Sequence, residues 1–235
     1  MSQEISNVII GGLQKSSLID YPEKISAIIF TQGCNFRCPY CHNPELIMID
    51  GSTALKVEPI FEFLKTRKGK LDGVVITGGE PALHKDLPEF IRKIKDMGFD
   101  VKLDTNGTNP QMLQELIDKK LIDYVAMDVK APIDKYSEVV CIQVNTDKIK
   151  ESINILKKSD IPYEFRTTVV KSQLTPEDFE KIGKLIKGAP LYYLQKFLPT
   201  KTLKKDFLNE ETYSDEEFEP ILESLKKYVK KVELR

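Results

Sequence analysis

The sequence predicts an α/β fold in which parallel strands alternate with helices. Short runs rich in Val, Ile, Phe and Tyr recur along the 235 residues, and amphipathic stretches separate them. Most of these runs are continuously apolar, as strands buried on both faces are. Roughly six β–α units follow one another, which is too few for a closed eight-fold barrel. We therefore expect a partial (β/α)6 barrel of the TIM type, with a doubly wound open sheet as the alternative.

The individual elements follow from the same pattern. Strands are expected at residues 25–31, 73–77, 100–104, 124–128, 163–170 and 191–196, with a short strand at 8–10. Helices are expected at residues 59–67, 88–97, 110–120, 147–158, 176–187 and 220–229. Several of these stretches, including the last, begin with proline, which is favoured at the first helical position because its missing N–H has no helical partner there.

Length and composition favour one cytoplasmic domain. A chain of 235 residues can bury one substantial core, and we divide it into a lead-in (1–23), a barrel core (24–199) and a charged tail with a helix (200–235). The 35 basic and 36 acidic residues nearly cancel, so bulk charge indicates neither nucleic acid nor an anionic membrane as a partner. The sequence shows neither a spanning apolar stretch nor the features of a secretion signal.

The cysteines indicate a metal or redox site. Cys34, Cys38 and Cys41 lie within eight residues, whereas Cys141 is far away and is expected to be a small buried hydrophobic residue. In a reducing compartment, closely spaced cysteines bind metal or do redox chemistry more often than they form disulfides. A [4Fe–4S] cluster usually takes four cysteines, so three thiolates would leave one iron open for a substrate.

Other chemistries fit parts of this loop. Cys38 and Cys41 form a C-P-Y-C dithiol like that of glutaredoxins, which leaves Cys34 unexplained. The C-x-x-C-H haem signature ends at His42, but covalent haem of this kind belongs to exported proteins. A Cys3His zinc site would need His42 to fold back beside its neighbour Cys41. Thiol redox and zinc binding stay open as alternatives. The other histidine, His84, is expected to be exposed at the start of a helix.

The cysteine spacing resembles the signature of the radical S-adenosylmethionine (SAM) superfamily. The longer string SLIDYPEKISAIIFTQGCNFRCPYCHNPEL resembles the activating enzymes of glycyl-radical enzymes, most of all those of anaerobic ribonucleoside-triphosphate reductases. The resemblance extends to about Pro199. It implies a radical SAM barrel and a [4Fe–4S] cluster, held by Cys34, Cys38 and Cys41, that cleaves SAM reductively to a 5′-deoxyadenosyl radical.

The same resemblance implies the partners of the reaction. The radical would be used to generate a glycyl radical on an anaerobic ribonucleotide reductase, and a flavodoxin or ferredoxin would donate the electron. A radical SAM enzyme that acts on a small molecule or an RNA precursor is the alternative within the superfamily.

Polar motifs follow the expected strands, at the ends where α/β barrels build their active sites. By resemblance, the SAM amino group would be received by Gly78, Gly79 and Glu80. A monovalent cation and the SAM carboxylate would be bound by Asp104, Thr105, Asp128 and Lys130. Other residues placed around SAM are Tyr40, Asn43, Arg166 and Gln195. Gln195 departs from the family pattern and could equally be a hydrogen-bonded amide at the end of its strand.

Overall fold

The computed structural model describes residues 8–235, and the chain divides into two compact units. The first unit comprises the described residues up to Asn35, Glu45–Thr105 and Gln111–Val125. The second comprises Phe36–Pro44, Asn106–Pro110 and Ala126–Arg235. The cysteine loop is therefore shared: Cys34 belongs to the first unit, and Cys38 and Cys41 belong to the second. That the whole chain acts as a single domain stays a prediction.

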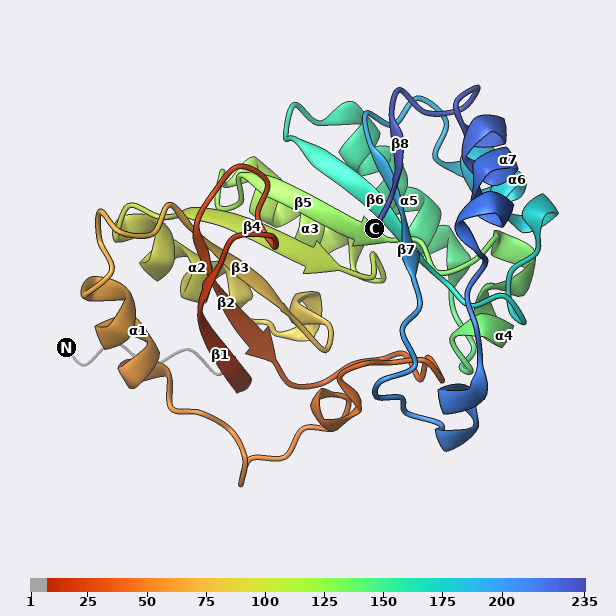
Figure 1. Cartoon of the computed structure of the whole chain (residues 1–235). Coiled ribbons are helices and arrows are strands. Elements are labelled where there is room, and N and C mark those ends of the chain that lie inside the picture. Colours follow the sequence, from red (N-terminus) through yellow and green to blue (C-terminus); the bar gives the residue numbers. More distant parts are fainter. Residues whose placement is uncertain (1–7) are drawn as a thin grey trace. The chain divides into compact units, whose positions relative to one another are not determined.

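Four strands of the first unit are neighbours in sequence order, as Figure 1 shows. They are β1 (Ile10–Ser17), β2 (Ser26–Thr31), β3 (Gly73–Gly78) and β4 (Asp100–Thr105). β1 runs antiparallel to β2, and the other two pairs are parallel. The helices are α1 (Val57–Lys65), α2 (Leu87–Asp96) and α3 (Pro110–Asp118), with 3-10 turns η1 (Pro44–Leu46) and η2 (Pro81–Leu83). Pro110 and Pro44 lie in the second unit.

The register of these strands positions the first part of the site. The apolar residues of β2 and β3 are buried on both faces, apart from the half-buried Phe30, as continuous hydrophobicity predicts. Thr31 pairs with Gly78, so the carboxyl ends of β2 and β3 lie side by side. The segment that leads to Cys34 follows β2. The turn formed by Gly78, Gly79 and Glu80, called the G-G-E turn below, begins at the end of β3.

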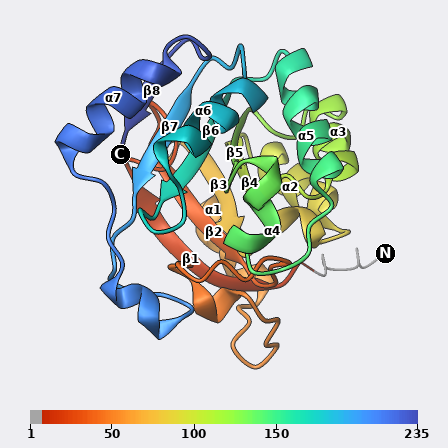
Figure 2. The same cartoon turned by 90° about the vertical axis from the view of Figure 1, so that its right-hand side faces the viewer.

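The second unit repeats the parallel arrangement. β6 (Tyr163–Val169), β7 (Tyr192–Lys196) and β8 (Val232–Leu234) are parallel neighbours. β5 (Tyr124–Asp128) contributes its last three residues, and Val129 directly after it donates its N–H to the carbonyl of Arg166 on β6. The helices are α4 (Tyr136–Val139), α5 (Thr146–Lys158), α6 (Pro176–Leu185) and α7 (Asp215–Leu225), with 3-10 turns η3 (Ile133–Lys135) and η4 (Lys205–Asn209). Figure 2 shows α6 packed beside α7.

Two predicted elements have markedly different bounds, and α4 and β8 were not predicted at all. The strand expected at 8–10 instead begins at Ile10 and continues to Ser17. The last helix begins at Asp215 rather than at Pro220, because Ser214 and Glu217 form a capping box and Pro220 lies inside the helix. No helix of the described residues is long and apolar enough to cross a membrane.

Candidate active site

In the first unit, the residues that lead to Cys34 are held on both sides by backbone hydrogen bonds. Gly33 donates its N–H to Leu46 at 2.8 Å and accepts from the N–H of Glu80 at 2.7 Å. Cys34 donates to the carbonyl of Ile47 at 3.0 Å. This irregular segment therefore has its backbone groups satisfied, as buried chain requires, and Cys34 has a defined position next to the G-G-E turn.

Both glycines of that turn are required because there is no room for a Cβ atom at either position. Gly78 has φ +113°, in the region that favours glycine, and a Cβ there would lie 2.4 Å from the backbone N of Thr31. A Cβ on Gly79 would lie 2.1 Å from the carbonyl oxygen of Gly33. The buried carboxylate of Glu80 accepts hydrogen bonds from Thr105 Oγ1 at 2.7 Å and from the N–H of Ala82 at 3.0 Å. The turn is thus fixed against β4.

Strand β4 adds an ion pair to the first unit. Lys102 and Asp104 are two residues apart and so share a face of the strand. Lys102 Nζ donates to Asp104 Oδ1 at 2.5 Å, and only 3% of the Lys102 side chain is exposed. With Glu80, Asp104 and Lys102 counted in their ordinary ionised forms, the formal net charge is −1, which suits an ammonium group.

In the second unit, the cysteine loop makes a tight turn in which Cys38 and Tyr40 are buried and Cys41 is half-buried. Cys41 donates its N–H to the carbonyl of Cys38 at 3.1 Å, which closes a tight turn between the two thiols. The ring of Tyr40 packs edge-on against Phe197. Both thiols are free, and burial raises the pKa of Cys38 to about 11 despite the opposing charge of Lys130. Metal binding at such a site would have to displace the Cys38 proton.

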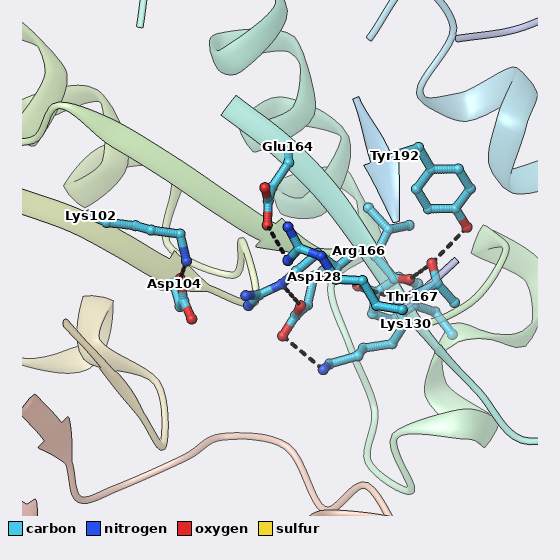
Figure 3. A network of polar contacts seen from close by, with 11 residues as sticks. Lys102, Asp104, Asp128, Lys130, Glu164, Arg166, Thr167 and Tyr192 are labelled. Atoms are coloured by element: carbon cyan, nitrogen blue, oxygen red, sulfur yellow. Dashed lines mark hydrogen bonds and ion pairs between the residues drawn. The ribbon is translucent and has the colours of Figure 1, made fainter. Parts of the chain in front are cut away.

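The end of β5 and the middle of β6 carry the polar centre of this unit (Figure 3). Asp128 accepts from Arg166 Nε on Oδ1 and from Lys130 Nζ on Oδ2, both at 2.9 Å. Burial acts to raise the pKa of Asp128, but the two cations outweigh it and hold the pKa at about 2. Asp128 is therefore ionised at neutral pH, and the net charge of +1 suits a carboxylate.

Replacing Asp128 with asparagine is expected to destabilise the protein by about 1–3 kcal/mol, because two neighbouring cations would lose their counter-charge. The expected loss of stability is smaller than for a fully buried ion pair, since 22% of the Asp128 side chain is exposed. Urea unfolding measures the change. Asp134→Asn is the matched control, because its pair with Lys181 lies on the surface and should contribute less than about 1 kcal/mol. Equal losses in the two variants would contradict the prediction.

Tyr136, which the sequence analysis missed, links this centre to the cysteine loop. Its hydroxyl accepts the N–H of Lys130 at 3.2 Å, and its ring packs edge-on against Phe36. The end of α4 contacts the same loop, because Val140 accepts the N–H of Arg37 at 3.0 Å. One short helix and the residue after it therefore contact both the cysteine loop and the turn at Lys130.

Tyr136→Phe should keep the ring contact and leave the N–H of Lys130 without its acceptor. We expect a loss of about 1 kcal/mol in stability and faster hydrogen exchange at the Lys130 amide. The Arg37 amide is the internal control, because its bond to Val140 does not involve the hydroxyl. Unchanged exchange at Lys130, measured residue by residue, would show that the hydroxyl does not hold this turn.

Two further expectations are corrected. Cys141 is exposed rather than buried, because it has φ +53° directly after α4 and does not continue a buried pattern. His84 is not a simple surface residue: its Nε2 lies 2.9 Å from the carbonyl oxygen of Gln32, and burial lowers the pKa of the ring. Asn43 and Gln195 are half-buried in the second unit, so their proposed roles stay predictions.

Among residues 8–235, no three His, Cys, Asp or Glu side chains are gathered closely enough to hold one metal ion. This does not weigh against a polynuclear cluster, because its thiolates bind different irons and therefore lie farther apart than the ligands of a single ion. Cys34, Cys38 and Cys41 form no disulfide, and three cysteine thiolates are the kind of donor set that iron–sulfur clusters use.

Comparisons with known proteins identify the family. Residues 28–186 match the radical SAM superfamily. The chain is 41% identical to a Methanocaldococcus jannaschii protein described as "Putative glycyl-radical enzyme activating enzyme MJ1227", over 97% of this chain and 95% of that protein. It is 28% identical to the pyruvate formate-lyase-activating enzyme of Clostridium pasteurianum, over 83% and 82% of the two chains.

Solved structures agree on the fold. Streptococcus suis SuiB bound to SAM has a TM-score of 0.68 at 14% identity, over 86% of this chain and about half (48%) of SuiB. A domain of a pyruvate-formate lyase-activating enzyme from Bacteroides vulgatus has a TM-score of 0.57 at 17% identity, over 69% of this chain and 98% of that domain.

The chain belongs to the radical SAM superfamily and, within it, to the glycyl-radical enzyme activating enzymes. The predicted fold class is confirmed, and the cofactors of the family are a [4Fe–4S] cluster and SAM. The family match decides against the thiol-redox and zinc alternatives.

Proposed function

We propose that Cys34, Cys38 and Cys41 hold the [4Fe–4S] cluster of this enzyme, and that the enzyme generates a glycyl radical on an anaerobic ribonucleotide reductase. The spacing of the three cysteines supports the first part, since none of them forms a disulfide and Cys141 is about a hundred residues away in the sequence. The 41% identity to a protein described as a putative glycyl-radical enzyme activating enzyme supports a glycyl-radical enzyme as the substrate. The choice of a ribonucleotide reductase rests on the resemblance of the sequence around the cysteines.

Each unit has one cluster of charged side chains, and the charge of the two clusters is the observation that supports SAM as their ligand. In the first unit, Glu80, Asp104 and Lys102 have a formal net charge of −1 in their ordinary ionised forms, which suits the methionyl ammonium of SAM. In the second unit, Asp128 with Lys130 and Arg166 has a net charge of +1, which suits the methionyl carboxylate. The Arg166 fork can offer planar, directed hydrogen bonds to such a carboxylate.

Residues of the chain would bind SAM and orient it. Gly79 lets the backbone of the G-G-E turn approach closely, and Asp128 holds Lys130 and Arg166 in fixed directions. When bound, the cluster and SAM supply a reductive C–S cleavage that gives methionine and a 5′-deoxyadenosyl radical. The electron would come from a flavodoxin or ferredoxin, and the reducing cytoplasm is the compartment that suits such a cluster.

The proposal is tested anaerobically with reconstituted, reduced protein. SAM cleavage to 5′-deoxyadenosine and methionine is measured first. An anaerobic ribonucleotide reductase is then added, either with its target glycine or with alanine in that position. We expect a glycyl radical signal in electron paramagnetic resonance spectra with the glycine form alone.

The outcomes separate the two parts of the proposal. SAM cleavage without a radical on any reductase would contradict the reductase as substrate and favour a small molecule or an RNA precursor. A reconstituted protein that holds a reducible cluster but neither binds nor cleaves SAM would contradict the assignment of the site.

A further inference from the structure

The three residues that the family resemblance assigns to a monovalent cation have other partners in this chain. In the first unit, Asp104 Oδ1 accepts from the ammonium of Lys102 at 2.5 Å. Thr105 donates its hydroxyl hydrogen to the buried Glu80. The ammonium group of Lys102 therefore already neutralises Asp104, which is the role that a metal cation would have.

Lys102 is well placed for such a role. It lies in the middle of β4, on the face that it shares with Asp104, and only 3% of its side chain is exposed. A buried ammonium is costly unless a carboxylate compensates it, so this lysine and Asp104 stabilise each other's charge. The lysine ammonium carries one compact positive charge, as K⁺ and Na⁺ do.

The second unit gives independent support. Both carboxylate oxygens of Asp128 accept hydrogen bonds, one from Arg166 and one from Lys130. The group has a net charge of +1 before any ion binds, and a further cation would add to the positive charge around Asp128. Like charges at such short range repel, so this group attracts an anion and disfavours a metal cation.

We propose that Lys102 replaces the monovalent cation of related enzymes, so that this enzyme binds SAM without K⁺ or Na⁺. The inference rests on the proposed function, because it concerns the same SAM site. Lys102 acts through Asp104 and is therefore a positioning residue. It would keep Asp104 neutralised and oriented whatever the salt composition of the cell.

The test measures SAM binding to the anaerobically reconstituted, oxidised protein in chloride salts of potassium, sodium or choline at equal ionic strength. Choline is too large to enter a site built for a metal ion. The dissociation constant of the wild type should change by less than about twofold among the three salts. For Lys102→Met, affinity in choline should fall by about tenfold or more, and K⁺ or Na⁺ should restore most of it.

A second readout needs no cluster. The melting temperature of unloaded wild-type protein should be the same in the three salts, whereas K⁺ or Na⁺ should raise that of Lys102→Met by filling the place of the ammonium. Lys102→Met with Asp104→Asn removes both charges and should show no such cation effect. Lys119→Met is the surface control, because Lys119 pairs with Glu115 on the exposed face of the first unit.

The proposal is overturned if wild-type affinity falls several-fold in choline and returns with K⁺ or Na⁺. It is also overturned if Lys102→Met folds, binds SAM weakly and gains nothing from either ion. If that variant does not fold, the salt comparison on the wild type still decides. Failure of the proposed function looks different: if the SAM site is wrong, SAM binds in none of the salts, and if the reductase is wrong, SAM binding is unchanged and no glycyl radical forms.

Discussion

Replacing Cys38 by alanine is expected to abolish the iron–sulfur cluster and SAM cleavage together. The triad supplies the minimum of three thiolates, so a variant with two would leave a second iron without a protein ligand. Loss of residues that merely support a metal ligand costs about 10–100-fold in affinity or activity. Loss of a ligand should therefore reduce turnover by at least about 10³-fold.

The measurement combines iron and sulfide content with 5′-deoxyadenosine formation. Cys141→Ala is the matched control, because Cys141 is the one cysteine outside the loop and its side chain is exposed. We expect the control to keep full cluster content. A Cys38→Ala protein that still carried a stable [4Fe–4S] cluster and cleaved SAM would show that Cys38 is not a ligand.

The second large effect is expected for Gly79→Ala. The added methyl carbon would lie 2.1 Å from the carbonyl oxygen of Gly33 and 3.1 Å from that of Leu46. Both neighbours are backbone atoms, so no side chain can rotate away and the turn itself must move. Overpacking of this kind costs about 1–3 kcal/mol, and more where the backbone is fixed.

Gly79→Ala should also break the hydrogen bond between Glu80 and Gly33, and so weaken SAM binding beyond the loss in stability. Urea unfolding and the dissociation constant of SAM give the two quantities. Gly51→Ala is the matched control in the same unit, because a Cβ there meets nothing within 4 Å. If both variants were equally stable and bound SAM equally, close approach at Gly79 would not matter.

The core strands were predictable because burial on both faces produces continuous apolar runs. β5 has the predicted bounds, and β2 and β3 differ from prediction by one residue at one end. β1 and β8 were not predictable in this way. β1 is rich in glycine and polar residues, and β8 has three residues, so each depends on the neighbouring strand for its hydrogen bonds.

The sequence by itself determined the fold class, the cysteine triad and the polar motifs at the strand ends, because spacing along the chain carries that information. Only the tertiary structure decided which charged groups meet. The sequence pattern assigns no role to Lys102, whereas the fold of β4 places its side chain in the interior beside Asp104. Tyr136 became significant once α4 folded its hydroxyl onto Lys130. Such pairings depend on which faces become buried together, and a buried charge or hydroxyl takes its role from the partner it finds there.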